Sequence, residues 1–170
     1  MPESEFKREK HTVLLTGAGR GLGLELTNYY LEHTEHDLVL LCFHECPKVD
    51  KKYKGRTIVY KKIDFLERKG LYAKFSKIFE EHSNIRTLVN NAAITDMRIF
   101  EHSKDADHCL DIMQVNFNGA VMLTKLFLKN LEGEGHLVNI ASVVSYSAIT
   151  HNTCYVASKH ALLGYKPPKI

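Results

Sequence analysis

The chain has 170 residues, 44% of them hydrophobic and 25% charged, and a formal net charge of +3 at pH 7. This length and composition predict one globular domain, over residues 11–170, that is large enough to form a hydrophobic core. The small net charge gives no basis for nucleic-acid binding, and no apolar run approaches the roughly 20 residues of a membrane span. Residues 1–10 form a charged lead-in without the apolar core of a signal peptide.

Strands are predicted to alternate with helices along the chain. The predicted strands cover residues 13–15, 37–44, 57–63, 86–90 and 136–142. The predicted helices cover residues 21–33, 66–82, 105–131 and 155–165, and the lysine-rich stretch 46–55 is a loop with or without a short helix. Alternation of this kind predicts an α/β fold with a doubly wound parallel sheet of about five strands.

A glycine-rich turn joins the first strand to the first helix. Its glycines are Gly17, Gly19, Gly21 and Gly23. Glycine tolerates positive φ and allows the backbone to approach a ligand closely, and the start of a helix offers free N–H groups to an anion. Strand, glycine turn and helix therefore predict a phosphate-binding loop, with a plain tight turn as the alternative.

The helix over residues 105–131 carries two apolar stripes. One stripe holds Leu110, Met113, Phe117, Val121 and Leu128, and the other holds Ile112, Val115, Leu123, Leu126 and Phe127. A helix that is apolar on two faces is covered twice, once by its own sheet and once by another surface. That second surface is either part of the same chain or a second subunit.

The four cysteines are Cys42, Cys46, Cys109 and Cys154, and they show no C-x-x-C spacing. We expect all four to be reduced, partly buried thiols of a cytoplasmic protein, because disulfides are rare in the cytosol. The ten histidines are scattered and form no H-E-x-x-H motif, so no metal site is predicted.

Polar residues follow several predicted strands, at the edge of the sheet where ligands bind in open parallel folds. They include His44, Asp64, Asn91 and Ser142. Farther along the chain, Tyr155 and Lys159 are four residues apart and share a helix face. A nearby ammonium group favours the phenolate form of tyrosine and lowers its pKa, which makes proton transfer to or from a carbonyl or alcohol oxygen easier.

Three motifs together resemble the short-chain dehydrogenase/reductase family: the glycine turn, Asn90-Asn91-Ala92-Ala93, and the set Ser142, Tyr155 and Lys159. The resemblance runs from about Thr12 to Tyr165. It implies a Rossmann-like fold and hydride transfer between a nicotinamide cofactor and a small-molecule carbonyl or alcohol.

The resemblance also implies roles for individual residues. Tyr155 is the general acid/base, Ser142 binds and orients the substrate, Lys159 also binds the nicotinamide ribose, and Asn116 supports a water relay to Lys159. The implied cofactor-binding residues are Thr16, Gly17, Arg20, Gly21, Leu22, Gly23, Asp64, Phe65, Asn91, Ala92, Ala93, Tyr155 and Lys159. Ala93 stands where the family usually has glycine, and Asp64 either accepts the adenine amino group or caps a helix.

The preferred cofactor follows from the end of the second strand. An acidic residue there would bind the ribose 2′-OH of NAD, but the sequence reads Cys42-Phe43-His44, with Glu45 one position later. Arg20 is able to pair with a 2′-phosphate. We therefore expect NADP in preference to NAD, with an ordinary exposed role for Arg20 as the alternative.

The resemblance ends near Tyr165, where family members continue with further strands and a substrate loop. Here Pro167 and Pro168 stop the helix. We therefore expect a chain shortened at its C-terminus, with an uncovered fifth strand. Two functions follow, an oxidoreductase or a non-catalytic remnant that binds cofactor weakly or pairs with a full-length relative. In either case the long helix is a candidate for a homo-oligomer interface.

Overall fold

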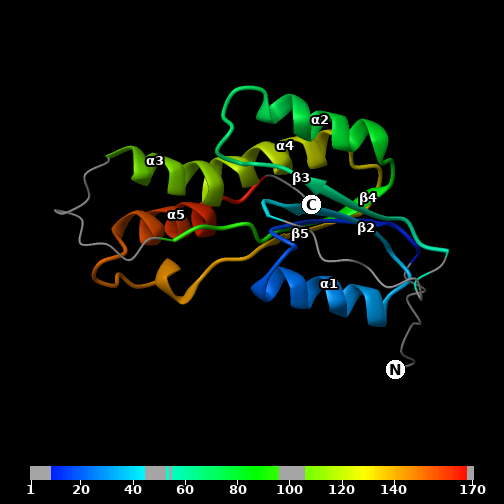
Figure 1. The fold of residues 1–170 in the computed structure, drawn as a ribbon, viewed down its shortest axis with the longest axis horizontal. Coiled ribbons are helices and arrows are strands. Elements are labelled where there is room, and N and C mark those ends of the chain that lie inside the picture. The colour runs from blue at the N-terminus through cyan, green and yellow to red at the C-terminus, as the bar shows by residue number, and fades with distance from the viewer. Residues whose placement is uncertain (1–8, 45–52, 54, 96–105, 168–170) are drawn as a thin grey trace.

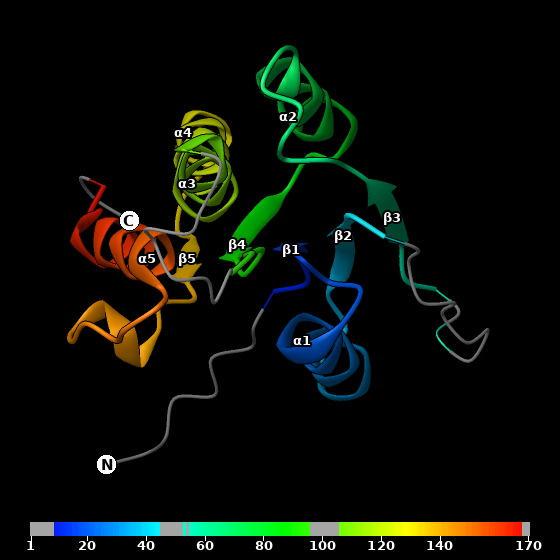
Figure 2. The same cartoon turned by 60° about the vertical axis from the view of Figure 1, so that its left-hand side comes forward.

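Five parallel strands form a single sheet in the computed structural model, which describes residues 9–44, 53, 55–95 and 106–167. The strands are β1 (Thr12–Thr16), β2 (Asp37–Cys42), β3 (Ile58–Lys62), β4 (Ile85–Asn90) and β5 (His136–Asn139). Their order across the sheet is β3-β2-β1-β4-β5 (Figure 2). The order reverses direction between β1 and β4, and this is where ligands bind in doubly wound sheets.

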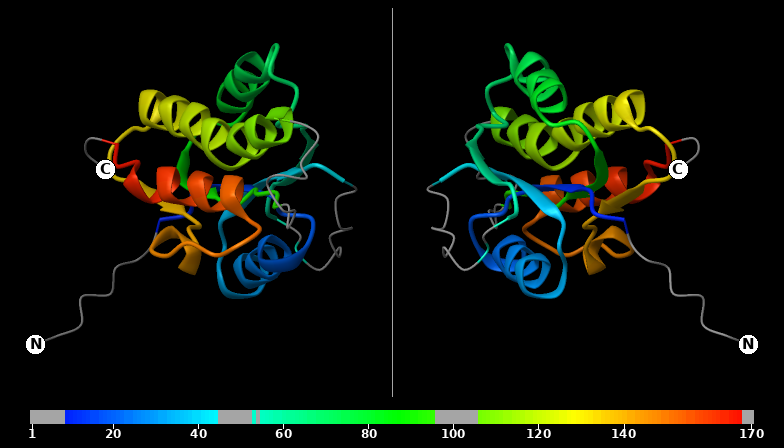
Figure 3. Two further views of the ribbon diagram at one scale, coloured as in Figure 1. Left: turned by 90° about the vertical axis from the view of Figure 1, so that its left-hand side faces the viewer. Right: turned by 90° about the vertical axis from the view of Figure 1, so that its right-hand side faces the viewer.

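Helices cover both faces of this sheet (Figure 2). They are α1 (Gly21–His33), α2 (Leu71–Glu81), α3 (Ala106–Met113), α4 (Gly119–Asn130) and α5 (Thr153–Gly164). A π-helix, η3 (Gln114–Asn118), joins α3 to α4, and a 3₁₀ turn, η4 (Val143–Ser145), precedes α5. The helix α1 lies on one face, α2 and α4 lie on the other, and α5 runs beside α3 (Figures 1 and 3).

The core has two layers because the central strands are buried on both faces. Leu14 of β1 packs with the side chains of α2 and α4, whereas its neighbours Val13 and Leu15 pack on the α1 side. All three side chains are fully buried. Continuous apolar runs are typical of strands in parallel sheets, and the predicted fold class is confirmed.

Helix α2 begins later than predicted, at Leu71 instead of residue 66. Asp64 Oδ1 accepts a hydrogen bond from Leu66 N at 2.8 Å, which closes a turn directly after β3. Gly70 has a φ of +85°, so its left-handed backbone separates that turn from the helix. The long predicted helix also differs from expectation, because five residues of π-helix interrupt it. The start of that helix at residue 105 and most of the 46–55 loop lie outside the described residues.

The prediction that all four cysteines are reduced is wrong for two of them. Cys109 of α3 and Cys154 of α5 form a disulfide, with their Cα atoms 5.2 Å apart. The pair is separated by 45 residues, so only the packing of α5 against α3 brings it together. Cys42 is a buried free thiol, and Cys46 lies outside the described residues.

The two stripes of the long helix differ in burial. Ile112, Leu123 and Phe127 of the second stripe are buried in the core. In the first stripe, Leu110 is exposed and Phe117 contacts the ring of Tyr165 at a centroid distance of 6.0 Å. The chain itself therefore covers only part of this stripe. Within the described residues, no helix combines the length and the apolar character needed to cross a bilayer.

Candidate active site

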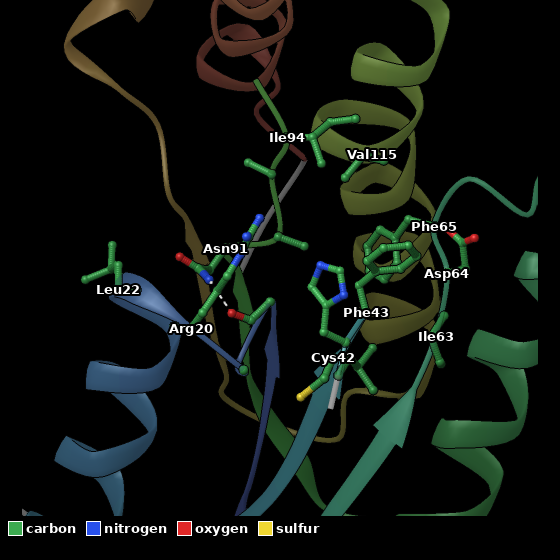
Figure 4. A pocket seen from close by; sticks show the side chains of 18 of the residues that line it. Arg20, Leu22, Cys42, Phe43, Ile63, Asp64, Phe65, Asn91, Ile94 and Val115 are labelled. Atoms are coloured by element: carbon green, nitrogen blue, oxygen red, sulfur yellow. Dashed lines mark hydrogen bonds between the residues drawn. The ribbon is translucent and has the colours of Figure 1, made fainter. Parts of the chain in front are cut away.

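A pocket of about 420 Å³ lies at the carboxyl ends of the strands. The loops after β1, β2, β3 and β4 all contribute to its wall (Figure 4). Ten residues predicted to bind cofactor line it, namely Gly17, Arg20, Gly21, Leu22, Gly23, Asp64, Phe65, Asn91, Ala92 and Ala93. The pocket thus forms around the glycine turn, at the position that the strand order favours.

The glycines of the turn meet different steric demands. Gly21 has a φ of +53°, and a Cβ added there would meet no atom within 4 Å, so its backbone borders open space. A Cβ on Gly23 would instead lie 2.0 Å from the carbonyl oxygen of Gly17. Gly17 combines a φ of +68° with Ala92 Cα only 2.9 Å from an added Cβ. Gly21 keeps space free for a ligand, whereas Gly17 and Gly23 allow close packing inside the protein.

Thr16 and Asn91 fix the glycine turn against the end of β4. The hydroxyl of Thr16 accepts hydrogen bonds from the backbone N–H groups of Asn91 and Ala92, both at 2.9 Å. The side-chain amide of Asn91 donates to the carbonyls of Thr16 and Gly17, at 2.9 and 3.2 Å. Thr16 is buried and is not among the residues that line the pocket. Its hydrogen bonds support the turn, and its contact with a cofactor stays a prediction.

Sequence analysis did not assign several apolar residues that line the pocket. These are Leu41, Cys42, Phe43, Ile63, Leu66, Ile94 and Val115, and Gly19 joins them. Their apolar periodicity predicts buried positions in strands and helices. Apolar residues that line a pocket follow the same periodicity, so the sequence alone does not distinguish them from core residues. For Ile94, the only available signal is its place directly after Asn-Asn-Ala-Ala.

The two walls of the pocket carry different polar groups. Arg20 is exposed beside the glycine turn, and His44 lies past the end of β2 with its ring 4.7 Å from that of Phe43. Asp64 and Phe65 lie across the pocket from Arg20 (Figure 4). One oxygen of Asp64 is already used in the turn to Leu66, but Asp64 caps no helix, because the N-cap of α2 is Gly70. Glu45 lies outside the described residues.

Tyr155 and Lys159 share one face of α5, as predicted. Lys159 Nζ lies 5.7 Å from the centroid of the Tyr155 ring and donates a hydrogen bond to Ile140 O at 2.8 Å. The side chain of Lys159 is only 3% exposed, and this burial lowers its pKa because the charged form loses hydration. A buried ammonium next to a phenol is an arrangement that favours proton transfer.

Asn116 lies in the π-helix η3, and its side chain connects two segments. Its Oδ1 accepts from Ile94 N at 2.8 Å, and its Nδ2 donates both to Ile94 O and to Ser158 Oγ at 2.9 Å. Both N–H bonds of the amide are therefore used within the protein. The π-helix is a frequent feature of functional sites, because its wider turn redirects side chains.

Ser142 precedes η4 and caps it. Its hydroxyl oxygen accepts a long hydrogen bond of 3.4 Å from Val144 N, and its backbone N–H donates to Ser145 Oγ. The hydroxyl proton of Ser142 has no role in that capping, so it is able to donate to another oxygen.

The predicted residues thus form two groups. Ten of the residues predicted to bind cofactor line the pocket, whereas Thr16, Asn116, Ser142, Tyr155 and Lys159 lie outside its lining. Ile94 joins the groups, because it lines the pocket while its backbone is held by Asn116, which in turn bonds to Ser158 on α5.

Comparison with known proteins agrees with this geometry. A family model described as short chain dehydrogenase matches residues 11–166. The human protein named short-chain dehydrogenase/reductase 3 is 31% identical over 163 residues, covering 92% of this chain and 53% of its own length. This chain spans about half the length of the curated relatives it matches.

Solved structures give the same result. A 4-hydroxyisoleucine dehydrogenase complexed with NADH and succinate is 26% identical, with a TM-score of 0.75 over 89% of this chain and 68% of its own. A metagenomic short-chain oxidoreductase in complex with NADP is 20% identical, with a TM-score of 0.76 over 91% of this chain and 72% of its own. At this low identity the second likeness establishes the fold alone.

Proposed function

The chain belongs to the short-chain dehydrogenase family, and we propose that it is an NAD(P)(H)-dependent oxidoreductase that interconverts a small-molecule carbonyl and alcohol. The observation that carries this proposal is the open backbone at Gly21. A residue with positive φ faces empty space inside a pocket lined by four strand ends, where an added side chain would meet nothing of the protein. Such space suits a phosphate group, which binds to backbone N–H groups at the start of α1.

The residues present fit a dinucleotide along the whole pocket. Gly17, Gly21 and Gly23 would hold the pyrophosphate, and Asp64 would accept from the adenine amino group through an oxygen not used in its turn. Asn91, Ala92 and Ala93 would line the nicotinamide ribose. The cofactor, when bound, supplies the hydride donor or acceptor of the reaction.

NADP is the preferred form in this proposal. Arg20 is an exposed guanidinium in the pocket wall, and His44 follows β2 where an NAD-binding protein would need a carboxylate. A guanidinium pairs well with a 2′-phosphate because it offers several N–H donors in one plane. Among the described residues that line the pocket, the carboxylate is that of Asp64. It follows β3, whereas NAD binding would need a carboxylate after β2.

Tyr155 serves as general acid/base in the proposed mechanism. Its phenol would transfer a proton to or from the reacting oxygen, and the ammonium of Lys159 would stabilise the phenolate that results. The hydroxyl of Ser142 would donate a hydrogen bond to the same oxygen and orient the substrate. Lys159 would also reach the ribose, and any water relay from Asn116 would have to spare both N–H groups of its amide, since Ile94 and Ser158 already accept from them.

Two further expectations belong to the same proposal. The partly exposed stripe on α3 and α4 is a candidate interface for a homo-oligomer. A cytoplasmic location also stays a prediction, and the Cys109–Cys154 disulfide removes the support that reduced cysteines would have given it. Size-exclusion chromatography with light scattering tests the first, and fluorescence imaging of a tagged chain tests the second.

The decisive experiment separates binding from turnover. NADPH and NADH are titrated into the purified chain by calorimetry, and carbonyl reduction is then followed by loss of cofactor absorbance over a panel of ketones and aldehydes. Tyr155→Phe should abolish turnover while the cofactor still binds, and Gly21→Val should abolish binding. Absence of binding for both cofactors would refute the proposal, and binding without turnover would favour a non-catalytic role.

A further inference from the structure

A covalent bond lies next to the proposed acid/base. Cys154 is the second residue of α5 and directly precedes Tyr155, and it is joined to Cys109 of α3. Both cysteines are partly exposed, so small molecules have access to the bond. This disulfide has no part in the mechanism proposed above, yet it holds the turn of helix from which Tyr155 projects.

Two other contacts reach the first turn of α5: Ser158 Oγ donates to Tyr155 O at 2.7 Å, and Lys159 Nζ lies 5.7 Å from the centroid of the Tyr155 ring. Both come from α5 itself, whereas the disulfide ties this turn to another helix. The helix follows a loop, residues 146–151, in which every residue is exposed. Asn152 occupies the N-cap position without a side-chain capping bond, because its Oδ1 accepts from Thr95 Oγ1 at 3.1 Å. Uncapped helix starts fray easily. Within α5, the first buried side chains are those of Ser158 and Lys159, one turn later.

The rest of α5 has independent attachments. Ser158 Oγ accepts from Asn116 at 2.9 Å, Lys159 Nζ donates to Ile140 O at 2.8 Å, and the ring of Tyr165 packs on Phe117. These contacts lie C-terminal to Tyr155. Opening the disulfide would therefore leave the helix docked and loosen only its first turn.

We propose that Cys109–Cys154 is a thiol–disulfide exchange site, opened by low-molecular-weight thiols, that controls the order of the first turn of α5 and so the position of Tyr155. In the opening reaction the thiolate of one small thiol attacks a cysteine sulfur, the S–S bond breaks, and a mixed disulfide forms. A second small thiol then releases that sulfur, so that two small thiols become one small disulfide and both cysteines gain a proton. The reverse reaction, with the small disulfide as oxidant, closes the bond.

The effect on Tyr155 as an acid/base rests on the proposed function, whereas the exchange site itself does not. Cys109 and Cys154 act as positioning residues in this proposal, because they reach the reacting groups only through the backbone of α5. The closed bond is expected to give the ordered state, since it fixes the first turn of α5, where the N-cap residue makes no side-chain capping bond. The open dithiol is expected to give the state in which proton transfer is slower.

Hydrogen exchange on the full 170-residue chain provides the test. Peptides are compared by mass spectrometry with and without dithiothreitol, after non-reducing digestion has been searched for the peptide that links Cys109 to Cys154. Reduction should speed exchange about tenfold in the first turn of α5, with little change in β1 and α1. The double variant Cys109→Ser/Cys154→Ser is the matched control, which should resemble the reduced chain and ignore the reductant.

The outcomes separate this proposal from the proposed function. Absence of the linked peptide under oxidising conditions, equal exchange in both states, or an equal increase in all helices would overturn the exchange site. Where turnover is measurable, reduction should lower kcat and leave the KM for NADPH unchanged, and an unchanged kcat would overturn the positioning of Tyr155. Failure of both the oxidised and the reduced chain to bind any cofactor would refute the proposed function. The hydrogen-exchange measurement would still decide whether the disulfide is an exchange site.

Discussion

The region around the glycine turn and the region that carries Tyr155 are built in different ways. Around the glycine turn, every residue of β1 is buried, and four hydrogen bonds join Thr16 and Asn91 to the neighbouring backbone. In the second region, Val138 of β5 is exposed, and Val143 and Tyr146 are 83% and 79% exposed. Backbone geometry and core packing fix the first region, whereas single bonds from side chains hold the second.

This difference predicts how each region responds to change. A defect in the first region should disturb the whole sheet, because its turn packs directly on β4. A defect in the second should stay local, because the contacts of Ser158, Lys159 and Tyr165 are separate from one another along α5. The predictions below test that contrast, beginning with the largest expected effect.

Gly23→Ala should disrupt the first region most severely. The new Cβ would lie 2.0 Å from the carbonyl oxygen of Gly17 and 2.6 Å from the side-chain nitrogen of Asn91, so the turn and the end of β4 must move apart. We expect a loss of about 4 kcal/mol or more in the free energy of unfolding, measured by urea denaturation. Gly164→Ala is the control, since its Cβ would meet no atom within 4 Å. Equal stability of the two variants would contradict the packing role of Gly23.

Removing the disulfide should weaken the second region. Cys109→Ser opens a loop closed across 45 residues, and disulfides typically contribute about 2–4 kcal/mol to the free energy of unfolding. Urea denaturation without reductant measures this loss. Cys154→Ser should lose the same amount, and the double variant no more than either single one, because each change removes the same bond. Additive losses would show that the two side chains contribute separately.

Arg20→Ala should sharpen the contrast within the first region, because it changes binding and not folding. If its guanidinium pairs with a 2′-phosphate, the variant should lose about 1.5–3 kcal/mol of NADPH affinity, or at least tenfold in Kd. NADH affinity should hardly change in the same calorimetric titrations. Arg68→Ala, at an exposed arginine paired with Asp111 away from the pocket, is the matched control. Equal Kd values for NADPH and NADH in the unmodified chain would contradict the preference for NADP.

The smallest expected effect concerns Lys159, and it is a dependence of the free energy of unfolding on pH. Burial lowers its pKa in the folded chain below the ordinary lysine value of 10.5, so the unfolded chain binds this proton more tightly. Between the lowered pKa and 10.5 the unfolded state therefore holds more protons, and the free energy of unfolding should rise with pH across that window. Lys159→Met should flatten this rise in urea titrations repeated at increasing pH. Lys125→Met, at an exposed position of α4, should leave it intact.

The fold was largely predictable from local patterns in the sequence. The apolar runs around Val13 and Val39 predict buried strands, and both bounds predicted for α1 are confirmed. The start of α2 was predicted wrongly, because the turn at Asp64 competes with a helix pattern that continues back to Leu66. The π-helix at Gln114–Asn118 was missed because its residues fit an ordinary helical period.

The candidate site was predictable only where a motif marks it. The glycine turn and Asn91 stand out in the sequence, and the structure brings them together in one pocket. The Cys109–Cys154 bond depends on the packing of two distant helices, which no spacing rule predicts. The bond from Asn116 to Ser158 has the same origin, and the roles of Tyr155, Lys159 and Ser142 stay predictions.

The π-helix makes the effect of a one-residue deletion depend on where it falls in the long helical segment. A π-turn contains one residue more than an α-turn, and each residue of an α-helix advances by about 100°. Deleting one residue within Gln114–Asn118 would therefore convert the π-turn to a regular α-turn and leave α3 and α4 in nearly the same rotational phase. A deletion in the regular helix between Cys109 and Gln114 would instead rotate Cys109 by about 100° relative to Asn116 and carry it away from α5. Two single-codon deletions a few residues apart would thus have opposite effects on which side chains meet, although the remaining residues could form a helix in both cases.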